Sequence, residues 1–429
     1  MRRPITFDVT HLVSRMAARA VTGIDRIDLA FGCHFAEVSG VDVSAAFCRA
    51  NVPYVMGTGA LKRIVRQAKR AAWEDSSAVD DANFARIKDW LNGRDQNPQA
   101  RRELAAARLG ADHWLAAQLW LNRCRWAPAM QPVRQKGIYL NIAEHWLEHH
   151  RYFEWLGSRP DVQVVFFVHD LLPFDYPEYF RADYDAVFLR RFQTMARHGT
   201  AFIVSTEVVR ARLAEALAAD NADAPIHVAP LPSPLALTDD QAIDEPPPAL
   251  PYFLLVGTVE PRKNHLLILN IWRELAADLG VHTPRLVLIG SRGWENEQVI
   301  DMLDRCAGIT NYVLRATRVS RQGLTWLMTH AQALLMSSFD EGYGLPIVEA
   351  LSLGTPVIAS DIPTFREVAR GSALLLSPID GMAWREAVTA LSDRQSPTWR
   401  AAKTQAEPFQ PPEWGSYFRG VDAFLRALQ

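Results

Sequence analysis

The sequence contains little cysteine. Among its 429 residues there are four cysteines, Cys33, Cys48, Cys124 and Cys306, and no two of them form a Cys-x-x-Cys pair. This spacing argues against a disulfide framework and against a zinc site built from thiolates. It is typical of proteins in a reducing compartment.

Long apolar runs and an excess of charge of one sign are also absent. No stretch approaches the roughly 18 consecutive apolar residues that would span a membrane. Lys and Arg number 46 against 48 Asp and Glu, so the formal net charge is −2, and nucleic acid is not expected as the main partner. The opening residues, MRRPITFDVTHLVSR, are interrupted by Asp8 and His11 before an apolar segment can form. We therefore expect no signal peptide and a cytoplasmic location.

What the sequence does contain is a regular alternation of short apolar runs and amphipathic stretches. Hydrophobic residues make up 49% and charged residues 22% of the chain, as in ordinary globular proteins. In the second half, the apolar runs predict strands at 252–257, 286–290, 312–315, 333–337, 356–359 and 373–376. The stretches between them predict helices at 265–279, 324–331, 346–353 and 382–392. Apolar strands joined by helices indicate a parallel sheet that is covered on both faces.

The first half shows the same alternation with more interruptions. Strands are predicted at 4–9, 42–47, 137–141, 163–168, 201–205 and 226–229. Residues 57–130 predict a long helical insertion that this sheet does not need. The acidic, proline-rich stretch 236–250 predicts a linker, and residues 411–429 predict a terminal helix. The fold class is therefore α/β, with two Rossmann-like domains, 1–245 and 246–410, that face each other across a cleft.

A candidate phosphate site lies at 252–264, YFLLVGTVEPRKN. A strand is expected to end at Gly257, and Arg262 and Lys263 follow just before a helix that begins near His265. Two cations beside the free N–H groups of a helix start favour an anion such as phosphate. A solvated basic loop is the alternative interpretation.

A second candidate is the loop in 338–356, SFDEGYGLPIVEALSLGTP. Gly342 and Gly344 let the backbone approach a ligand closely. Glu341 precedes the helix that is expected to follow, and Glu349 lies about one turn inside it. Two carboxylates on either side of free amides suit the hydroxyls and phosphates of a nucleotide sugar. In the alternative interpretation, Glu341 caps the helix and Glu349 lies on the surface.

The segments GTVEPRKN, IGSRGWENE and SSFDEGYGLPIVEALSLGTPVIASDIPTFREV resemble the family 4 glycosyltransferases of the GT-B fold. The resemblance covers 250–370 and continues more weakly into the first half. There, VVFFVHDLLPFDYPEYF at 164–180 is similar to the family's histidine-bearing strand end, and TGIDRI at 22–27 is similar to its loop after the first strand. The insertion at 57–130 does not align with the family. The resemblance implies that domain 1–245 binds the acceptor, that domain 246–410 binds the nucleotide sugar, and that the terminal helix 411–429 crosses back to the N-terminal domain.

The resemblance implies a role for each matching residue. Arg262 and Lys263 correspond to the cations that bind the donor diphosphate. Glu341 corresponds to the glutamate that holds the donor sugar, and Glu349 to the one that holds the nucleotide ribose. His169 is implied to lie beside the donor sugar on the acceptor side.

The resemblance also implies donor contacts outside these five residues. Val319 and Arg321, in the loop ATRVSRQG, fall where the family contacts the base. The remaining contacts are implied for Gly23, Thr258, Gly342, Tyr343, Gly344 and Leu345.

The implied reaction is a retaining hexosyl transfer from a nucleotide-diphosphate sugar to a saccharide or lipid-linked saccharide acceptor. The sequences of the C-terminal motifs, GTVEPRKN and SRGW especially, are similar to those of bacterial mannosyl- and rhamnosyltransferases of surface-polysaccharide assembly. This similarity favours GDP-mannose as the donor. No metal or other cofactor is implied. Positive groups and helix N-termini would instead stabilise the charge of the leaving diphosphate.

Two alternatives stay open at this point. His145, Glu148 and His149 form the pattern His-x-x-Glu-His, which on a helix places both imidazoles on one face and suits the zinc of a metallopeptidase. A non-catalytic nucleotide-sugar-binding protein would share the two-domain cleft. Asp183 and Asp185 form an Asp-x-Asp pair, which binds a metal and a diphosphate in a different glycosyltransferase fold. Here they fall early in an expected helix, where carboxylates usually interact with the helix dipole, so a metal site is not expected from them.

Residues 61–73 predict an amphipathic helix with a strongly basic face. One side carries apolar residues, and lysines and arginines cover much of the rest; the apolar residues are Leu61, Ile64, Val65, Ala68, Ala72 and Trp73. Such a helix suits peripheral contact with the anionic cytoplasmic face of the inner membrane. Packing against its own domain is the alternative.

Overall fold

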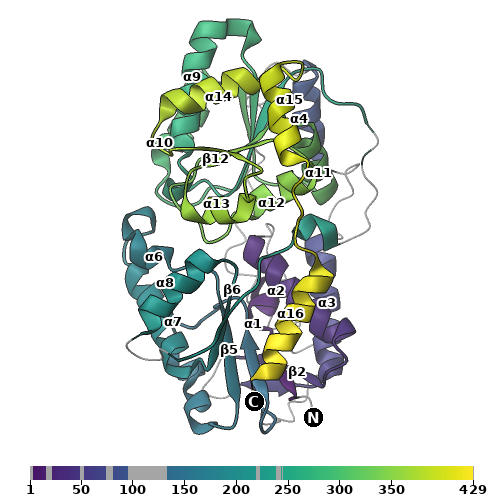
Figure 1. Ribbon diagram of the computed structural model, residues 1–429, viewed down its shortest axis with the longest axis vertical. Coiled ribbons are helices and arrows are strands. Elements are labelled where there is room, and N and C mark those ends of the chain that lie inside the picture. Colours follow the sequence, from purple (N-terminus) through teal and green to yellow (C-terminus); the bar gives the residue numbers. More distant parts are fainter. Residues whose placement is uncertain are drawn as a thin grey trace.

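The computed structural model describes residues 3–15, 22–48, 53–73, 81–94, 133–218, 223–237, 243 and 245–428. These residues form two α/β units, which lie one above the other in Figure 1. We call the lower one the N-terminal unit and the upper one the C-terminal unit. Cys124 and most of the predicted insertion lie outside the described residues.

A seven-stranded sheet forms the N-terminal unit, in the order β3-β2-β1-β4-β5-β6-β7. Its strands are β1 (Ile5–Asp8), β2 (Val43–Phe47), β3 (Tyr54–Met56), β4 (Ile138–Asn141), β5 (Gln163–Val168), β6 (Ala201–Val204) and β7 (Ile226–Val228). Neighbouring strands are parallel except β2 and β3, which pair antiparallel. The six strands predicted for this half are confirmed. The sequence did not predict β3, because it is an edge strand of only three residues with an exposed tyrosine.

A six-stranded, fully parallel sheet forms the C-terminal unit, in the order β10-β9-β8-β11-β12-β13. Its strands are β8 (Tyr252–Val256), β9 (Arg285–Ile289), β10 (Val313–Ala316), β11 (Leu334–Met336), β12 (Val357–Ser360) and β13 (Leu374–Leu376). Each agrees with a predicted strand. The strand order reverses between β8 and β11, and ligands of doubly wound sheets bind at such a reversal, beyond the carboxyl ends of the strands.

Helices cover both faces of each sheet. Those of the N-terminal unit include α1 (Thr10–Arg15), α2 (Gly23–Cys33), α3 (Thr58–Trp73), α6 (Leu172–Asp175), α7 (Tyr184–His198) and α8 (Glu207–Leu217). Those of the C-terminal unit include α9 (His265–Leu279), α10 (Glu297–Arg305), α11 (Arg321–His330), α12 (Leu345–Ser352), α13 (Pro363–Ala369), α14 (Gly381–Leu391) and α15 (Pro397–Ala406). Along β5, Val165 and Phe167 pack into one core, and Val164 and Phe166 pack into another. Both faces of this strand are therefore buried, which explains its unbroken apolar sequence.

Helix α3 belongs to the N-terminal unit and lies against α1, α2 and β2. Its apolar residues Leu61, Ile64, Val65 and Ala68 are buried in the core. The prediction of an insertion that the sheet does not need is thus wrong for this segment, which covers one face of the sheet. These four side chains are therefore not available to a bilayer, and a membrane contact along this part of the helix would use its basic side. Among the described residues, no helix is both long enough and apolar enough to cross a membrane.

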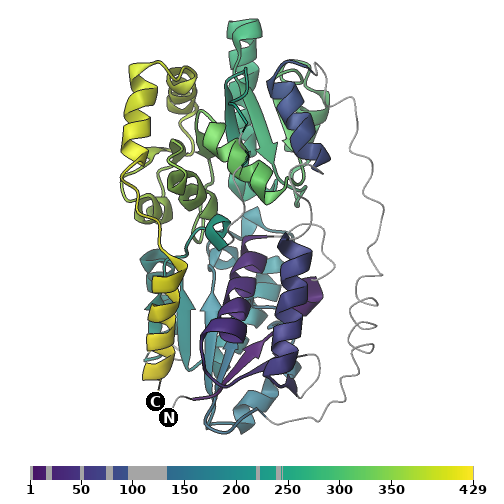
Figure 2. The same ribbon diagram turned by 90° about the vertical axis from the view of Figure 1, so that its right-hand side faces the viewer.

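Helices α4 (Ala82–Leu91) and α16 (Trp414–Ala427) each pack on the unit that the rest of their half of the chain does not form. The resemblance implied this crossing for the terminal helix, whereas nothing in the sequence indicated where α4 would pack. Helix α4 comes from the first half but lies on the C-terminal unit, at the upper right of Figure 2. Helix α16 ends the chain and lies along the N-terminal unit in both views. There, Phe418 stacks on His34 with 4.1 Å between ring centroids, and His34 Nε2 lies 3.0 Å from Asp422 Oδ1.

Candidate functional site

Two loops meet at the reversal of the C-terminal sheet and bring three charged residues together. A short turn after β8 carries Arg262 and Lys263, and the loop after β11 carries Glu341. Arg262 Nη1 lies 2.6 Å from Glu341 Oε2, and Lys263 Nζ pairs with the other oxygen of the same carboxylate. Ser338 Oγ donates a third hydrogen bond to Glu341, at 2.8 Å. These residues form one compact cluster beyond the carboxyl ends of β8 and β11.

The electrostatics of this cluster keep Glu341 ionised. Glu341 is only 7% exposed, and burial alone would raise the pKa of its carboxyl group. The charges of Arg262 and Lys263 outweigh burial and lower this pKa to about 2. Arg262 also donates to Glu260 at 2.7 Å, a carboxylate whose pKa is raised by burial. The cations are therefore fixed in place by buried carboxylates.

A close approach of two glycines shapes the loop after β8. A Cβ atom at Gly290 would lie 1.8 Å from the carbonyl oxygen of Gly257, so only glycine fits there. At Gly257, where φ is +153°, the side chain of Lys263 lies above the backbone. Thr258 follows in the same turn, half-buried and beside Gly293. The loop thus folds back over the end of its own strand and directs Lys263 toward Glu341.

Helix α12 begins at the second loop. Gly344 is its N-cap residue, with φ of +97°, and Leu345 is its first residue. The hydroxyl of Tyr343 donates to the carbonyl of Leu231 in the N-terminal unit at 2.8 Å. The Tyr343 side chain therefore joins the two units, and its backbone remains for the donor contact that the resemblance implies.

Three contacts join this loop and α12 to the N-terminal unit. A Cβ atom at Gly342 would lie 2.5 Å from the carbonyl oxygen of His169. A Cβ atom at Gly23 would lie 3.1 Å from the side chain of Leu345. Arg26, in the first turn of α2, donates to Glu349 on α12 at 3.1 Å. Residues predicted separately in the two halves of the sequence are thus brought together across the interface of the two units.

Glu349 differs from Glu341 in having a single cation beside it. It is 2% exposed, and burial raises the pKa of its carboxyl group while Arg26 opposes that shift. The segment TGIDRI pointed to Gly23, whereas Arg26, three residues later, was missed. A cation one turn into the helix that faces the donor loop was the signal that could have identified it.

His169 lies at the end of β5 as a neutral imidazole. Its Nε2 donates to the carbonyl of Ile142 at 2.8 Å, and burial lowers the pKa of the ring to about 4. Its backbone N–H donates to Glu144 at 3.0 Å, and burial raises the pKa of that carboxyl group to about 7. Sequence reasoning missed Glu144, although it lies in NIAEH, directly after a predicted strand.

Val319 and Arg321 lie after β10, at the same edge of the sheet as the charged cluster but two strands away from β8. Arg321 is the first residue of α11. The loop that carries them contacts α4. The sequence did not predict this contact.

The zinc alternative is wrong. Residues 145–149 form turns and not the helix that would place both imidazoles on one face. The ring of His145 stacks on Trp146 at 4.9 Å, and Glu148 is held by Arg191 at 2.9 Å. Across the described residues, no group of three or more His, Cys, Asp or Glu side chains is arranged to hold a metal ion.

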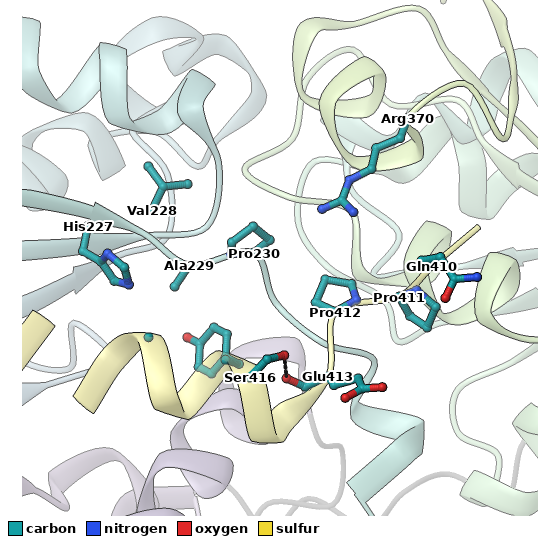
Figure 3. A pocket seen from close by; sticks show the side chains of 12 residues that line it. His227, Val228, Ala229, Pro230, Arg370, Gln410, Pro411, Pro412, Glu413 and Ser416 are labelled. Carbon is teal, nitrogen blue, oxygen red and sulfur yellow. Dashed lines mark hydrogen bonds between the residues drawn. The ribbon is translucent and has the colours of Figure 1, made fainter. Parts of the chain in front are cut away.

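A separate hollow of about 450 Å³ lies where the chain returns from α15 to α16. Figure 3 shows His227 on one side, Arg370 on the other, and Pro412 and Glu413 of the returning segment between them. None of the charged cluster lines this hollow. The predicted donor residues therefore belong to a different region, at the facing edges of the two sheets.

The comparison with protein families decides the class of the C-terminal unit. The family described as glycosyl transferases group 1 matches residues 238–406. The C-terminal unit belongs to this family. Its β8-to-α13 region contains the three motifs that carry the stronger part of the resemblance, so the resemblance to this class of glycosyltransferases is confirmed.

Curated relatives that match this unit include mannosyltransferases. The chain is 30% identical over 228 residues, half of its length, to the serotype-specific mannosyltransferase WbdA of Escherichia coli. It is 33% identical over 152 residues to the O-antigen chain mannosyltransferase B of Escherichia coli, which is 32% of this chain. The matched segments cover 28% and 39% of these relatives' own lengths.

Solved structures establish the architecture of the whole chain. Sucrose-phosphate synthase from Thermosynechococcus elongatus matches with a TM-score of 0.60 and 16% identity, over 100% of this chain and 99% of that one. Anabaena HepE in complex with UDP and glucose matches with a TM-score of 0.59 and 13% identity, over the full length of both chains. Together with the two parallel sheets, these matches show the GT-B fold.

Proposed function

We propose that the protein transfers a hexose, mannose or a related sugar, from a nucleotide-diphosphate sugar to a saccharide or lipid-linked saccharide acceptor. The proposed donor is GDP-mannose, the proposed stereochemical course is retaining, and the proposed setting is the assembly of a bacterial surface polysaccharide. The group 1 family of the C-terminal unit and the mannosyltransferases among its relatives support this proposal.

The observation that carries the proposal is the cluster of Arg262, Lys263 and Glu341 at the strand reversal. A nucleotide diphosphate gains negative charge as it leaves the sugar, and preorganised cations stabilise that charge without reorganising in the transition state. Buried carboxylates hold both cations before any ligand arrives. The start of α12 adds the positive end of a helix dipole.

The proposal gives each carboxylate and His169 a role. Glu341, ionised and beside the cations, would accept hydrogen bonds from the hydroxyls of the donor sugar. Glu349 would accept hydrogen bonds from the ribose hydroxyls. These bonds would replace the hydrogen bond from Arg26 or be formed beside it. His169 is neutral, and its Nε2 is already committed to a carbonyl, so only Nδ1 is left to accept a hydrogen bond from a sugar hydroxyl on the acceptor side.

No divalent metal enters the proposed reaction. Arg262, Lys263 and the helix start would supply the positive potential that a metal supplies in other transferases. A membrane contact, if the acceptor is lipid-linked, would involve the exposed basic residues of α3 and not its buried apolar side.

A thermal-shift panel with GDP, UDP, dTDP and ADP sugars tests the donor. A ligand that binds the folded state raises the unfolding midpoint, and we expect GDP-mannose to give the largest shift. Transfer is then assayed with the stabilising donor and a set of mannose-containing acceptors. Stabilisation by none of the four sugars would contradict the proposal, and stabilisation without transfer would favour the non-catalytic binding protein instead.

A further inference from the structure

A single carboxylate joins helix α4 to the loop between β10 and α11. Asp81 is the N-cap residue of α4, and its Oδ1 accepts from the backbone N–H groups of Asn83 and Phe84 at 3.1 and 2.9 Å. Its other oxygen accepts from the backbone N–H of Ser320, which is itself the N-cap residue of α11. Asp81 and Ser320 are 8% and 5% exposed, so this junction is buried.

A second polar contact holds the same loop two residues earlier. Asn83 Nδ2 donates to the carbonyl oxygen of Arg318 at 2.8 Å. The backbone is therefore fixed on both sides of Val319, by a side chain at the start of α4 in each case. One turn further along the helix, Arg86 donates to the carbonyl of Arg315 at the end of β10.

Apolar packing extends this contact to the residues around Val319. The ring of Phe84 is 2% exposed and meets Trp326 edge-on at 5.4 Å. A Cβ atom at Gly323 would lie 2.9 Å from the Phe84 ring and 2.8 Å from the Val319 side chain. Phe84 and Val319 therefore pack against the same glycine, at the first turn of α11.

We infer that α4 sets the shape of the loop that reads the nucleotide base, with Asp81 and Asn83 as its positioning residues. The inference rests on the proposed function and on the base contact that the family resemblance implies for Val319 and Arg321. Neither Asp81 nor Asn83 needs to touch the ligand. They fix the peptide groups beside Val319, and a base is discriminated by hydrogen-bonding groups whose positions are fixed before binding.

The inference separates recognition of the base from recognition of the diphosphate. The diphosphate would bind at Arg262 and Lys263, two strands away, and these residues receive none of the contacts from α4 described above. Loss of the α4 contacts should therefore weaken binding of a nucleoside diphosphate and leave binding of inorganic pyrophosphate unchanged.

Asp81→Ala and Asn83→Ala test this separation, with Asp89→Ala as the matched control. Asp89 lies on the same helix, but its side chain is 50% exposed and pairs with Arg94. Calorimetry measures the dissociation constants of GDP, UDP, dTDP and ADP, and of pyrophosphate, for each variant and the wild type. For Asp81→Ala we expect about tenfold weaker binding of the preferred nucleotide, because a loop that Asp81 no longer holds must be ordered when the nucleotide binds. The dissociation constants of the four nucleotides should also become more similar to one another.

Asn83→Ala provides a second route should Asp81→Ala fail to fold, because it removes one half-buried amide and leaves the cap of α4 intact. Asn83→Ala should weaken nucleotide binding less than Asp81→Ala does, and it should leave the affinity for pyrophosphate unchanged. Wild-type nucleotide affinity in the folded variants would overturn the inference. An equal loss for nucleotide and pyrophosphate would overturn it too, because it would show general damage to the fold. Failure of the wild-type protein to prefer any nucleotide over pyrophosphate would overturn the proposed function itself.

Discussion

Arg26 of the N-terminal unit and Glu349 of the C-terminal unit form an ion pair, with 3.1 Å between Nη1 and Oε1. The carboxylate side chain is only 3% exposed and the guanidinium side chain is 24% exposed. Arg26 therefore offsets part of the cost of burying a charge on α12, and burial still raises the pKa of the Glu349 carboxyl group. The pair also joins α2 to the helix that begins the proposed donor site.

Arg26→Ala should destabilise the protein by leaving Glu349 buried without a partner. The loss of one member of a buried pair typically costs about 3 kcal/mol, and we expect a corresponding fall in the midpoint of thermal unfolding. The double variant Arg26→Ala/Glu349→Gln removes the uncompensated charge and should recover part of that loss. Equal midpoints for the single and double variants would contradict this account of the pair.

Gly342→Ala should separate the two units at the proposed site. The new Cβ atom would lie 2.5 Å from the carbonyl oxygen of His169 and 2.9 Å from Asp170, so the loop must shift. Misplacement by about 1 Å can reduce a rate by about a hundredfold, and we expect at least a tenfold loss of transfer in initial-rate assays. Gly59→Ala is the control, because its Cβ atom would meet nothing closer than 3.9 Å. Wild-type rates for Gly342→Ala would show that this contact does not matter for turnover.

Lys263→Ala should remove part of the charge that stabilises the leaving diphosphate. We expect kcat/KM to fall by an amount equivalent to about 2–4 kcal/mol, the usual effect of losing one such group. Glu349→Ala should raise KM more than it lowers kcat, because a ribose contact is similar in the ground and transition states. Steady-state kinetics with varied donor distinguish the two patterns. If both variants turn over normally at limiting donor, the site assignment is wrong.

The raised pKa of Glu144 predicts a dependence of stability on pH. Its pKa is 4.5 in a reference peptide and about 7 in the fold, because of burial. Between these values the folded state holds more protons than the unfolded state, so this group makes stability fall as pH rises from 4.5 to 7. The full loss is about 3 kcal/mol.

Glu144→Gln should remove this component while keeping an oxygen to accept from the His169 N–H. The difference between the unfolding midpoints of variant and wild type should therefore grow from about pH 5 to about pH 7 and stay constant above. Parallel curves over this range would show that Glu144 does not titrate as described.

Transfer should persist in excess EDTA, because the proposed reaction uses fixed cations in place of a metal. It should also depend only modestly on salt, since charges inside a closed site are screened less than exposed ones. Donor turnover with and without chelator, at low and high ionic strength, provides the measurement. Loss of activity in EDTA that magnesium or manganese restores would refute the metal-free mechanism.

The sequence predicted the sheets well because both faces of their strands are buried. An unbroken apolar run such as 163–168 is typical of a strand inside a parallel sheet, and it agrees with β5 to the residue. The charged cluster could be anticipated for a related reason, since Lys263 and Glu341 follow strands whose ends meet at one edge. Their local patterns are sufficient to place them there.

The contacts between units could not be predicted in this way. Arg26 and Glu349 are 323 residues apart, and the periodicity of one segment carries no information on the other. The position of α4 on the C-terminal unit was missed for the same reason, because its apolar residues fit a helix on either unit. The zinc pattern failed because His-x-x-Glu-His requires a helix, and the chain turns there instead.

The two crossing helices bear on how this architecture can be recombined. A chimera that exchanges residues 246–410 with those of a relative would replace the surface on which Phe84 and Trp90 are buried, while keeping the helix that supplies them. In such a chimera, the α11 of the relative would have to pair with the Asp81 of this chain. A better chimera would exchange residues 81–94 together with the C-terminal unit and keep α16 with the N-terminal unit. Each helix would then stay with the unit on which it packs. The boundaries suited to grafting donor preference thus differ from those that the linear sequence suggests.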